Sequence, residues 1–168
     1  LFVLDTMVGG KAVNDLELVR TLAGNSADAI DWLDGLGAEL HNVGSFGGAS
    51  VKRIHRPVNA EGKTVSVGAH IIPVLEKACA DAVVEIIYNA PVTEILMDGG
   101  KAVGVKAEGY TVNAKSVILA SGGFGANLKM VAELKPSLDG FVTTNAPGVT
   151  GDGIQMAQAV GAATVDMD

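Results

Sequence analysis

Two short segments of the sequence place glycines beside a group that can form hydrogen bonds. The first, Ala120-Ser121-Gly122-Gly123, follows the β-forming run Val117–Leu119 and precedes a helix-like segment. In an open α/β sheet, ligands bind in the crevice outside the carboxyl ends of the strands. Because glycine has no Cβ, a flat or phosphorylated ligand can reach the backbone at such a place. The alternative is a tight turn between strand and helix.

The second segment, Thr150-Gly151-Asp152-Gly153, places a carboxylate between two glycines ahead of another helix-like run. Such a carboxylate can accept hydrogen bonds from the hydroxyl groups of a ligand. It can also act as an N-cap that accepts hydrogen bonds from the first backbone N–H groups of the helix. The spacing alone does not choose between these two roles of Asp152.

The other polar residues form no arrangement that predicts a catalytic group. His41 and His55 lack a cysteine or carboxylate at ligand spacing, so we expect no metal site. We expect His70, at the start of a helix, to bond to nearby backbone. The basic run Lys52–Arg56 suits either an anionic group or solvent. Cys79 is expected to be an inert, buried thiol.

Composition and charge exclude some classes of binding partner for this protein. The 168 residues are 48% hydrophobic, which favours a single compact domain. The formal charge of −7 argues against a nucleic-acid partner, and no apolar run is long enough for a membrane span. The chain begins with Leu1, so we expect a piece of a longer protein. Its compartment is unknown, and we expect a soluble protein, either cytoplasmic or exported.

Hydrophobic periodicity predicts helices mixed with short strands. Their order predicts an α/β nucleotide-binding sheet with an antiparallel β-meander inserted in a crossover. The predicted helices are Asn14–Gly24, Ala27–Leu36, Val67–Ala82, Asn127–Lys135 and Ile154–Val160; the predicted strands are Val83–Tyr88, Val92–Met97, Ala102–Ala107, Tyr110–Ala114 and Val117–Leu119, and residues 42–66 are predicted as a long ordered loop.

Five segments carry a resemblance to a known family. They are SFGGASVKRIHRP, VGAHIIPVLEKA, SVILASGGFGAN, KPSLDGFVTTNAPGVTGDGI and AVGAATVDMD, in this order. The sequence resembles the flavoprotein subunit of soluble fumarate reductases of the flavocytochrome c type, with urocanate reductases among the relatives. The looser pair ASGG and TGDG is shared with succinate dehydrogenase flavoproteins, L-aspartate oxidases and ketosteroid dehydrogenases.

The resemblance implies an α/β fold that is part of an FAD-binding, Rossmann-like domain of the glutathione-reductase type. Residues 1–168 would form part of this domain, without its amino-terminal dinucleotide fingerprint and without the capping domain. The implied activity is hydride transfer to the C=C bond of an α,β-unsaturated carboxylate, fumarate-like or urocanate-like, with an unidentified electron donor. The family's catalytic side chains would lie outside this chain, so we assign no catalytic residue and expect the chain alone to be inactive.

The resemblance also implies roles for individual residues. The backbone of Val92 would meet the adenine side of FAD, Ala120-Ser121-Gly122-Gly123 would line the cofactor crevice, and Asp152 would bond FAD. Ser121 replaces the threonine that is common there and keeps the hydroxyl. Phe46 would cover one face of the substrate, which favours a flat conjugated acid; the alternative is a phenylalanine packed within its loop.

Two other functions stay open at this stage. One is a flavin dehydrogenase of the ketosteroid type, whose substrate is bulky and uncharged. The other is a non-catalytic nucleotide-binding module that holds an adenylate in the glycine crevice. A yellow preparation of the whole protein would favour an enzyme over the module.

Overall fold

The computed structural model describes residues 1–167. Contacts group the chain into two compact units, Leu1–Ile86 and Ile87–Asp168, where the length alone favours one domain. The element pairs that contact each other most, such as α1 with α2 and β3 with β4, each lie within one unit.

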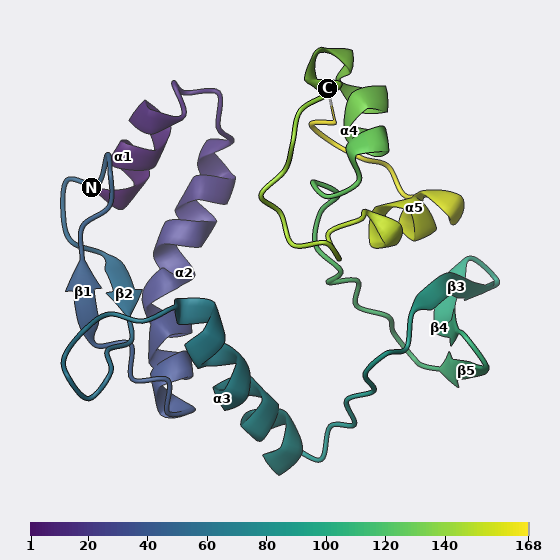
Figure 1. Cartoon of the computed structure of the whole chain (residues 1–168), viewed down its shortest axis with the longest axis horizontal. Coiled ribbons are helices and arrows are strands. Elements are labelled where there is room, and N and C mark those ends of the chain that lie inside the picture. Colours follow the sequence, from purple (N-terminus) through teal and green to yellow (C-terminus); the bar gives the residue numbers. More distant parts are fainter. Residues whose placement is uncertain (168) are drawn as a thin grey trace. The chain divides into compact units, whose positions relative to one another are not determined.

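The first unit begins with two helices, α1 (Phe2–Gly9) and α2 (Leu16–Gly35), which contact each other (Figure 1). Asp15 caps α2 by accepting hydrogen bonds from the backbone N–H groups of Glu17 and Leu18 at 2.8 and 3.1 Å. The N-cap therefore lies one residue beyond the predicted Asn14, and the helix begins at Leu16.

The prediction of two helices, Asn14–Gly24 and Ala27–Leu36, is wrong because α2 runs through Gly24 without a break. Polar residues around Gly24 bond back to carbonyl groups of the same helix. Asn25 donates to the Thr21 carbonyl at 2.7 Å, and Ser26 donates to the Ala23 carbonyl at 3.1 Å. These bonds satisfy side chains that otherwise favour turns, so the helix continues.

The predicted long loop over residues 42–66 is also wrong in part, because it contains a β-hairpin. Strands β1 (Asn42–Gly44) and β2 (Ile54–Arg56) pair antiparallel, and residues 45–53 connect them. Val58 and Thr64 form a further isolated bridge. Strands this short lack the alternating pattern by which longer strands are recognised.

Helix α3 (Val67–Asp81) confirms the prediction made for this segment. The buried strand predicted at Val83–Tyr88 is wrong: Val83 has a φ of +58° and is 91% exposed, and no strand forms there. A strand needs a neighbour to satisfy its backbone groups. Within residues 1–167, no strand pairs with this segment.

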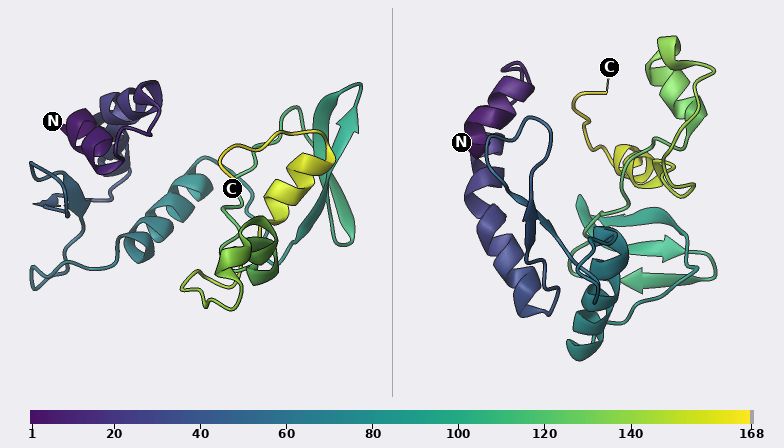
Figure 2. Two further views of the ribbon diagram at one scale, coloured as in Figure 1. Left: turned by 90° about the horizontal axis from the view of Figure 1, so that it is seen from above. Right: turned by 60° about the vertical axis from the view of Figure 1, so that its left-hand side comes forward.

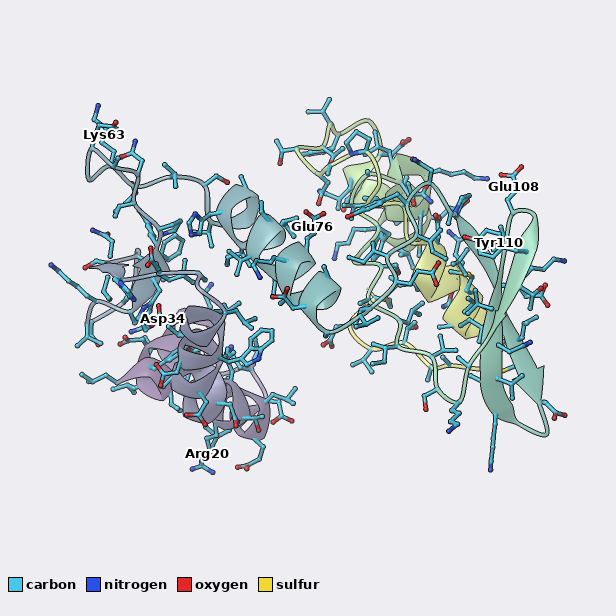
Figure 3. The ribbon with its side chains drawn as sticks, turned by 90° about the horizontal axis from the view of Figure 1, so that it is seen from below. Arg20, Asp34, Lys63, Glu76, Glu108 and Tyr110 are labelled. Atoms are coloured by element: carbon cyan, nitrogen blue, oxygen red, sulfur yellow. The ribbon has the colours of Figure 1, made fainter. Side chains whose placement is uncertain are left out.

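The second unit contains the predicted meander, which the structure confirms. Strands β3 (Val92–Asp98), β4 (Lys101–Ala107) and β5 (Tyr110–Asn113) form an antiparallel sheet in the order β3-β4-β5. Glycines with positive φ allow the tight turns: Gly99 and Gly100 precede β4, and Gly109 follows Glu108 before β5 (Figure 3).

Two helices follow the sheet, as predicted. Helix α4 (Leu128–Leu134) ends ahead of Pro136, which begins the 3-10 turn Pro136–Leu138, and α5 (Asp152–Ala159) contacts β3 (Figure 2). Between β5 and α4, the buried strand predicted at Val117–Leu119 is absent. Ile118 is 91% exposed, and no neighbouring strand is described for it.

The described residues thus form helices with two antiparallel sheets, one of which is the predicted meander. The fully packed interior is small. Val19, Ala38, Leu40 and Pro57 are buried in the first unit, and Ala107 is the buried apolar residue of the second.

A substitution in the meander tests how closely β4 and β5 approach. A Cβ added at Gly104 would lie 2.2 Å from the carbonyl oxygen of Val112. We expect Gly104→Ala to lower the free energy of unfolding by roughly 1–3 kcal/mol, as overpacking does, in urea denaturation followed by circular dichroism. Gly68→Ala is the control, because nothing lies within 4 Å of its added Cβ. Equal stability of the two variants would contradict the tight packing.

Candidate functional site

The two glycine segments singled out in the sequence lie side by side in the second unit. The N–H of Ala126 donates to the carbonyl of Val149 at 2.8 Å, and the side-chain amide of Asn127 donates to the carbonyl of Thr150 at 3.0 Å. The same Asn127 caps α4, because its Oδ1 accepts from the N–H of Met130 at 3.1 Å. One side chain therefore fixes the helix start to the segment that leads into α5.

The closest contact between the segments involves Ser121 and Gly153. A Cβ added at Gly153 would lie 1.9 Å from Ser121 Oγ and 3.3 Å from a methyl group of Leu119. Gly151 precedes α5 with a φ of +82°, and a Cβ there would lie 2.8 Å from Phe124 Cβ. Both glycines are buried, so their lack of a side chain is what lets the two segments meet.

The glycine pair next to this contact stays open to solvent. Gly122 and Gly123 are exposed; nothing lies within 4 Å of a Cβ added at Gly122, which has a φ of +78°, and at Gly123 the nearest atom is a methyl carbon of Val149 at 4.0 Å. The core of the protein does not fill this position. Both roles predicted for Gly122 and Gly123 are compatible with the structure. The pair makes a turn, and its backbone is accessible to a ligand.

Asp152 is the first residue of α5 and is exposed, with Gly151 in the N-cap position. The alternative that Asp152 is the N-cap is wrong, because no side chain caps this helix. Its negative charge suits the amino terminus of a helix. The same charge repels a phosphate placed there, so the position favours a ligand that donates a hydrogen bond, such as a hydroxyl group.

Val92 begins β3 in the same unit and is 37% exposed. It is paired with Ala107, and a register shift follows before Glu94. Ala120, Ser121 and Asp152 are exposed as well. The structure therefore brings Ser121 to the start of α5, and it leaves the predicted cofactor residues accessible in one unit.

Phe46 belongs to the first unit, on the loop between β1 and β2. Its side chain is 68% exposed, so the alternative of a phenylalanine packed within its loop is wrong. The Phe46 carbonyl accepts a hydrogen bond from the N–H of Ala49 at 3.0 Å, and Gly48 between them has a φ of +82°. A turn thus presents the ring to solvent.

A partly buried ion pair holds the base of this loop, and no pattern in the sequence predicts it. Arg53 bonds the Asp5 carboxylate at 2.6 Å, with the two side chains 20% and 11% exposed. The N–H and the hydroxyl of Ser50 both donate to the same Asp5 oxygen at 2.9 Å. Arg53 also lies over the ring of Phe2, 4.7 Å from its centroid. Arg53 therefore binds an anionic group of the protein itself and is not a charge that only solvent surrounds.

These donors lower the pKa of the Asp5 carboxyl from 3.8 to about 2. The largest cause is the hydrogen bond from the Ser50 backbone, followed by the hydrogen bonds from the Arg53 and Ser50 side chains. Asp5 lies 45 and 48 residues before Ser50 and Arg53, and no local pattern marks a pairing over such a distance.

The histidines serve as structural groups. His70 lies 2.7 Å from the carbonyl of Ala38, His55 lies 3.1 Å from the carbonyl of Leu40, and His41 contacts Asp34 at 2.6 Å. His70 thus bonds to backbone, as predicted. Over residues 1–167, three or more histidine, cysteine or acidic side chains do not gather as a metal site would need. In that same part of the chain, no helix has the length and apolarity to cross a membrane.

Comparison with protein families gives a match over the whole chain. The model described as "FAD binding domain" matches residues 1–168. The chain belongs to this family. FAD is the cofactor that the membership indicates.

Within the FAD binding domain family, the chain is similar to reductases of unsaturated acids. The chain is 43% identical to a fumarate reductase (cytochrome) of Shewanella frigidimarina, over 97% of this chain and 29% of that protein. It is 35% identical to a urocanate reductase of Eggerthella lenta, over 97% of this chain and 28% of that protein. The chain therefore spans less than a third of the length of these relatives.

A solved structure has the same fold over nearly all of the chain. It is the open conformation of a flavocytochrome c3 fumarate reductase, with a TM-score of 0.87 and 39% identity. The match covers 96% of this chain and 29% of that one. The resemblance stated from the five sequence segments is thereby confirmed.

The lowered pKa of Asp5 predicts how stability depends on pH. Between pH 4 and pH 2, the unfolded chain binds a proton at Asp5 that the folded chain does not, so the ion pair's contribution is complete above about pH 4 and is lost as the pH falls toward 2. We expect the difference in unfolding free energy between the natural protein and Asp5→Asn to shrink over this range. Denaturant titrations at pH 5, 3 and 2 measure it, and a difference that does not change with pH would contradict the assignment.

The contact of Ser121 with Gly153 predicts that alanine at position 153 destabilises α5, although alanine usually stabilises a helix. Alanine normally stabilises a helix by about 0.5–1 kcal/mol relative to glycine, and we expect this for Gly24→Ala, where nothing lies within 4 Å. Gly153→Ala should instead destabilise by roughly 1–3 kcal/mol and weaken FAD binding. Adding Ser121→Gly should restore stability, as measured by thermal unfolding. A stabilised Gly153→Ala variant would show that the contact is not close.

Proposed function

We propose that the intact protein is a flavin-dependent reductase that transfers hydride to the C=C bond of a small α,β-unsaturated carboxylic acid. The observation that carries this proposal is the 43% identity with a fumarate reductase along 97% of the chain. The urocanate reductase among the relatives supports the same substrate class. An electron donor, still to be identified, would supply the reducing equivalents.

The residues of the second unit fit an FAD molecule. The exposed Gly122-Gly123 backbone offers a surface without Cβ atoms, and the packing of Ser121 on Gly153 holds it beside the start of α5. We expect Ala120, Ser121, Gly122 and Gly123 to line the cofactor crevice. Asp152 would accept a hydrogen bond from a hydroxyl group of FAD, because its charge disfavours a phosphate.

The chain itself would bind and orient the cofactor. FAD supplies the hydride chemistry when bound. The backbone of Val92 would contact the adenine side from the start of β3, and Asp152 would fix the cofactor by its hydroxyl groups. We assign no catalytic residue to this chain, and we propose that the groups that donate a proton and bind the carboxylate lie elsewhere in the intact protein.

Phe46 would cover one face of the substrate. Its ring is exposed on a turn that one hydrogen bond closes, so the ring is accessible for stacking on a flat molecule. This favours a planar conjugated acid, urocanate-like, over the smaller fumarate.

The chain would be part of a Rossmann-like FAD-binding domain of the glutathione-reductase type. Several apolar side chains on either side of the meander are exposed in this structure, for example Ile87 at 52% and Ile118 at 91%. Exposed apolar side chains that lie close together mark a surface that other protein segments cover. We propose that segments outside this chain, among them the dinucleotide fingerprint, cover these side chains and complete the domain.

The proposal is tested on the intact protein that contains this chain. We expect a yellow protein that reduces fumarate or urocanate with reduced methyl viologen as donor. Asp152→Asn should weaken FAD binding roughly tenfold or more, the value for a lost hydrogen bond to a charged group, as measured by flavin fluorescence. Asp28→Asn is the matched control, because Asp28 is exposed on α2.

Two outcomes would contradict the proposed activity, and a third would contradict the role of Asp152. A colourless protein that does not bind added FAD would indicate a non-catalytic nucleotide-binding module. A flavoprotein that oxidises a ketosteroid and leaves both acids unchanged would indicate the dehydrogenase. Equal FAD affinity of the two variants would remove Asp152 from the cofactor site.

A further inference from the structure

The loop that carries Phe46 is fixed at its base and free at its tip. At the base, the N–H of Arg53 donates to the carbonyl of Gly44 at 3.1 Å and closes the connection between β1 and β2. At the tip, Phe46 is 68% exposed. An exposed aromatic side chain on an ordered loop is a common form of recognition element.

We propose that Asp5 is a positioning residue that holds this loop so that Phe46 can contact the substrate. This inference rests on the proposed function, and it adds a residue to which the sequence assigned no role. Asp5 lies on α1 and would act only through Ser50 and Arg53, without touching the substrate.

The contacts of Asp5 explain why one carboxylate can control the loop. Three donors meet a single oxygen, Oδ2: the N–H of Ser50, the hydroxyl of Ser50 and the guanidinium of Arg53. Most of the ion pair is shielded from water, so solvent weakens it less than it weakens an exposed pair. The asparagine isostere removes the charge that all three donors share.

Helix α1 also contacts Arg53 through the ring of Phe2. Phe2 and Asp5 are three residues apart, so they lie on one face of α1. The guanidinium of Arg53 lies 4.7 Å from the Phe2 ring centroid while it bonds Asp5. The ring and the carboxylate together restrict the orientation of Arg53, and hence the base of the loop.

Positioning by Asp5 predicts a specific kinetic change in the intact protein. With urocanate as substrate, we expect Asp5→Asn to raise KM roughly three- to tenfold, the loss of one aromatic contact, with kcat changed less than about twofold. The FAD content should stay the same. Glu17→Gln is the control: it breaks the exposed 2.6 Å pair with Arg20 on α2, and KM should not change.

A double-mutant cycle separates positioning from a merely structural role. Phe46→Ala should raise KM by a similar factor, and Asp5→Asn should add nothing further in that background. If Asp5→Asn proves unstable, Arg53→Lys serves instead, because lysine keeps the charge but loses the planar contact with Phe2.

Each outcome decides a different point. Equal KM for Asp5→Asn and the natural protein, or an effect of the same size with and without Phe46, overturns the inference while the reductase activity stands. A protein that binds FAD but reduces neither fumarate nor urocanate overturns the proposed function, and the inference with it. Loss of the Asp5→Asn effect in the Phe46→Ala background supports it.

Discussion

The candidate cofactor site depends on a contact that exists only because Gly153 has no side chain. The start of α5 approaches Ser121 so closely that a methyl group would lie 1.9 Å from the serine oxygen. This contact joins two segments that are about thirty residues apart, and it brings the start of α5 against Ser121, the residue before the exposed Gly122-Gly123 backbone. The hydrogen bonds from Ala126 and Asn127 to the second segment strengthen the same junction.

The two glycine pairs of this site therefore have different physical roles. Gly151 and Gly153 are buried, and their missing side chains allow protein to pack on protein. Gly122 and Gly123 are exposed, and their missing side chains leave the backbone open to a ligand. The two motifs have a similar composition in the sequence. Only the burial of each glycine in the structure shows whether it allows protein packing or leaves the backbone accessible to a ligand.

Elements with local signals could be predicted from the sequence. The meander carries glycine turns at both reversals, and α3, α4 and α5 have helical periodicity with clear ends. The prediction of buried strands at Val83–Tyr88 and Val117–Leu119 is wrong because a strand needs a partner, and within residues 1–167 no strand pairs with either segment. The motifs ASGG and TGDG could be singled out from their glycines, and the structure brings Ser121 of the first against Gly153 of the second. Asp5 could not be found, since its partners lie 45 and 48 residues away.

The base and the tip of the loop between β1 and β2 are held by different hydrogen bonds. All of the bonds to Asp5 come from Ser50 and Arg53, while the turn from Phe46 to Ala49 makes its own hydrogen bond. An exchange of the aromatic residue at the tip therefore leaves the anchor intact. Under the proposed function, selectivity for different acids would diverge by single substitutions at position 46 on an unaltered scaffold, whereas a change at position 5 would leave Ser50 and Arg53 without their shared acceptor.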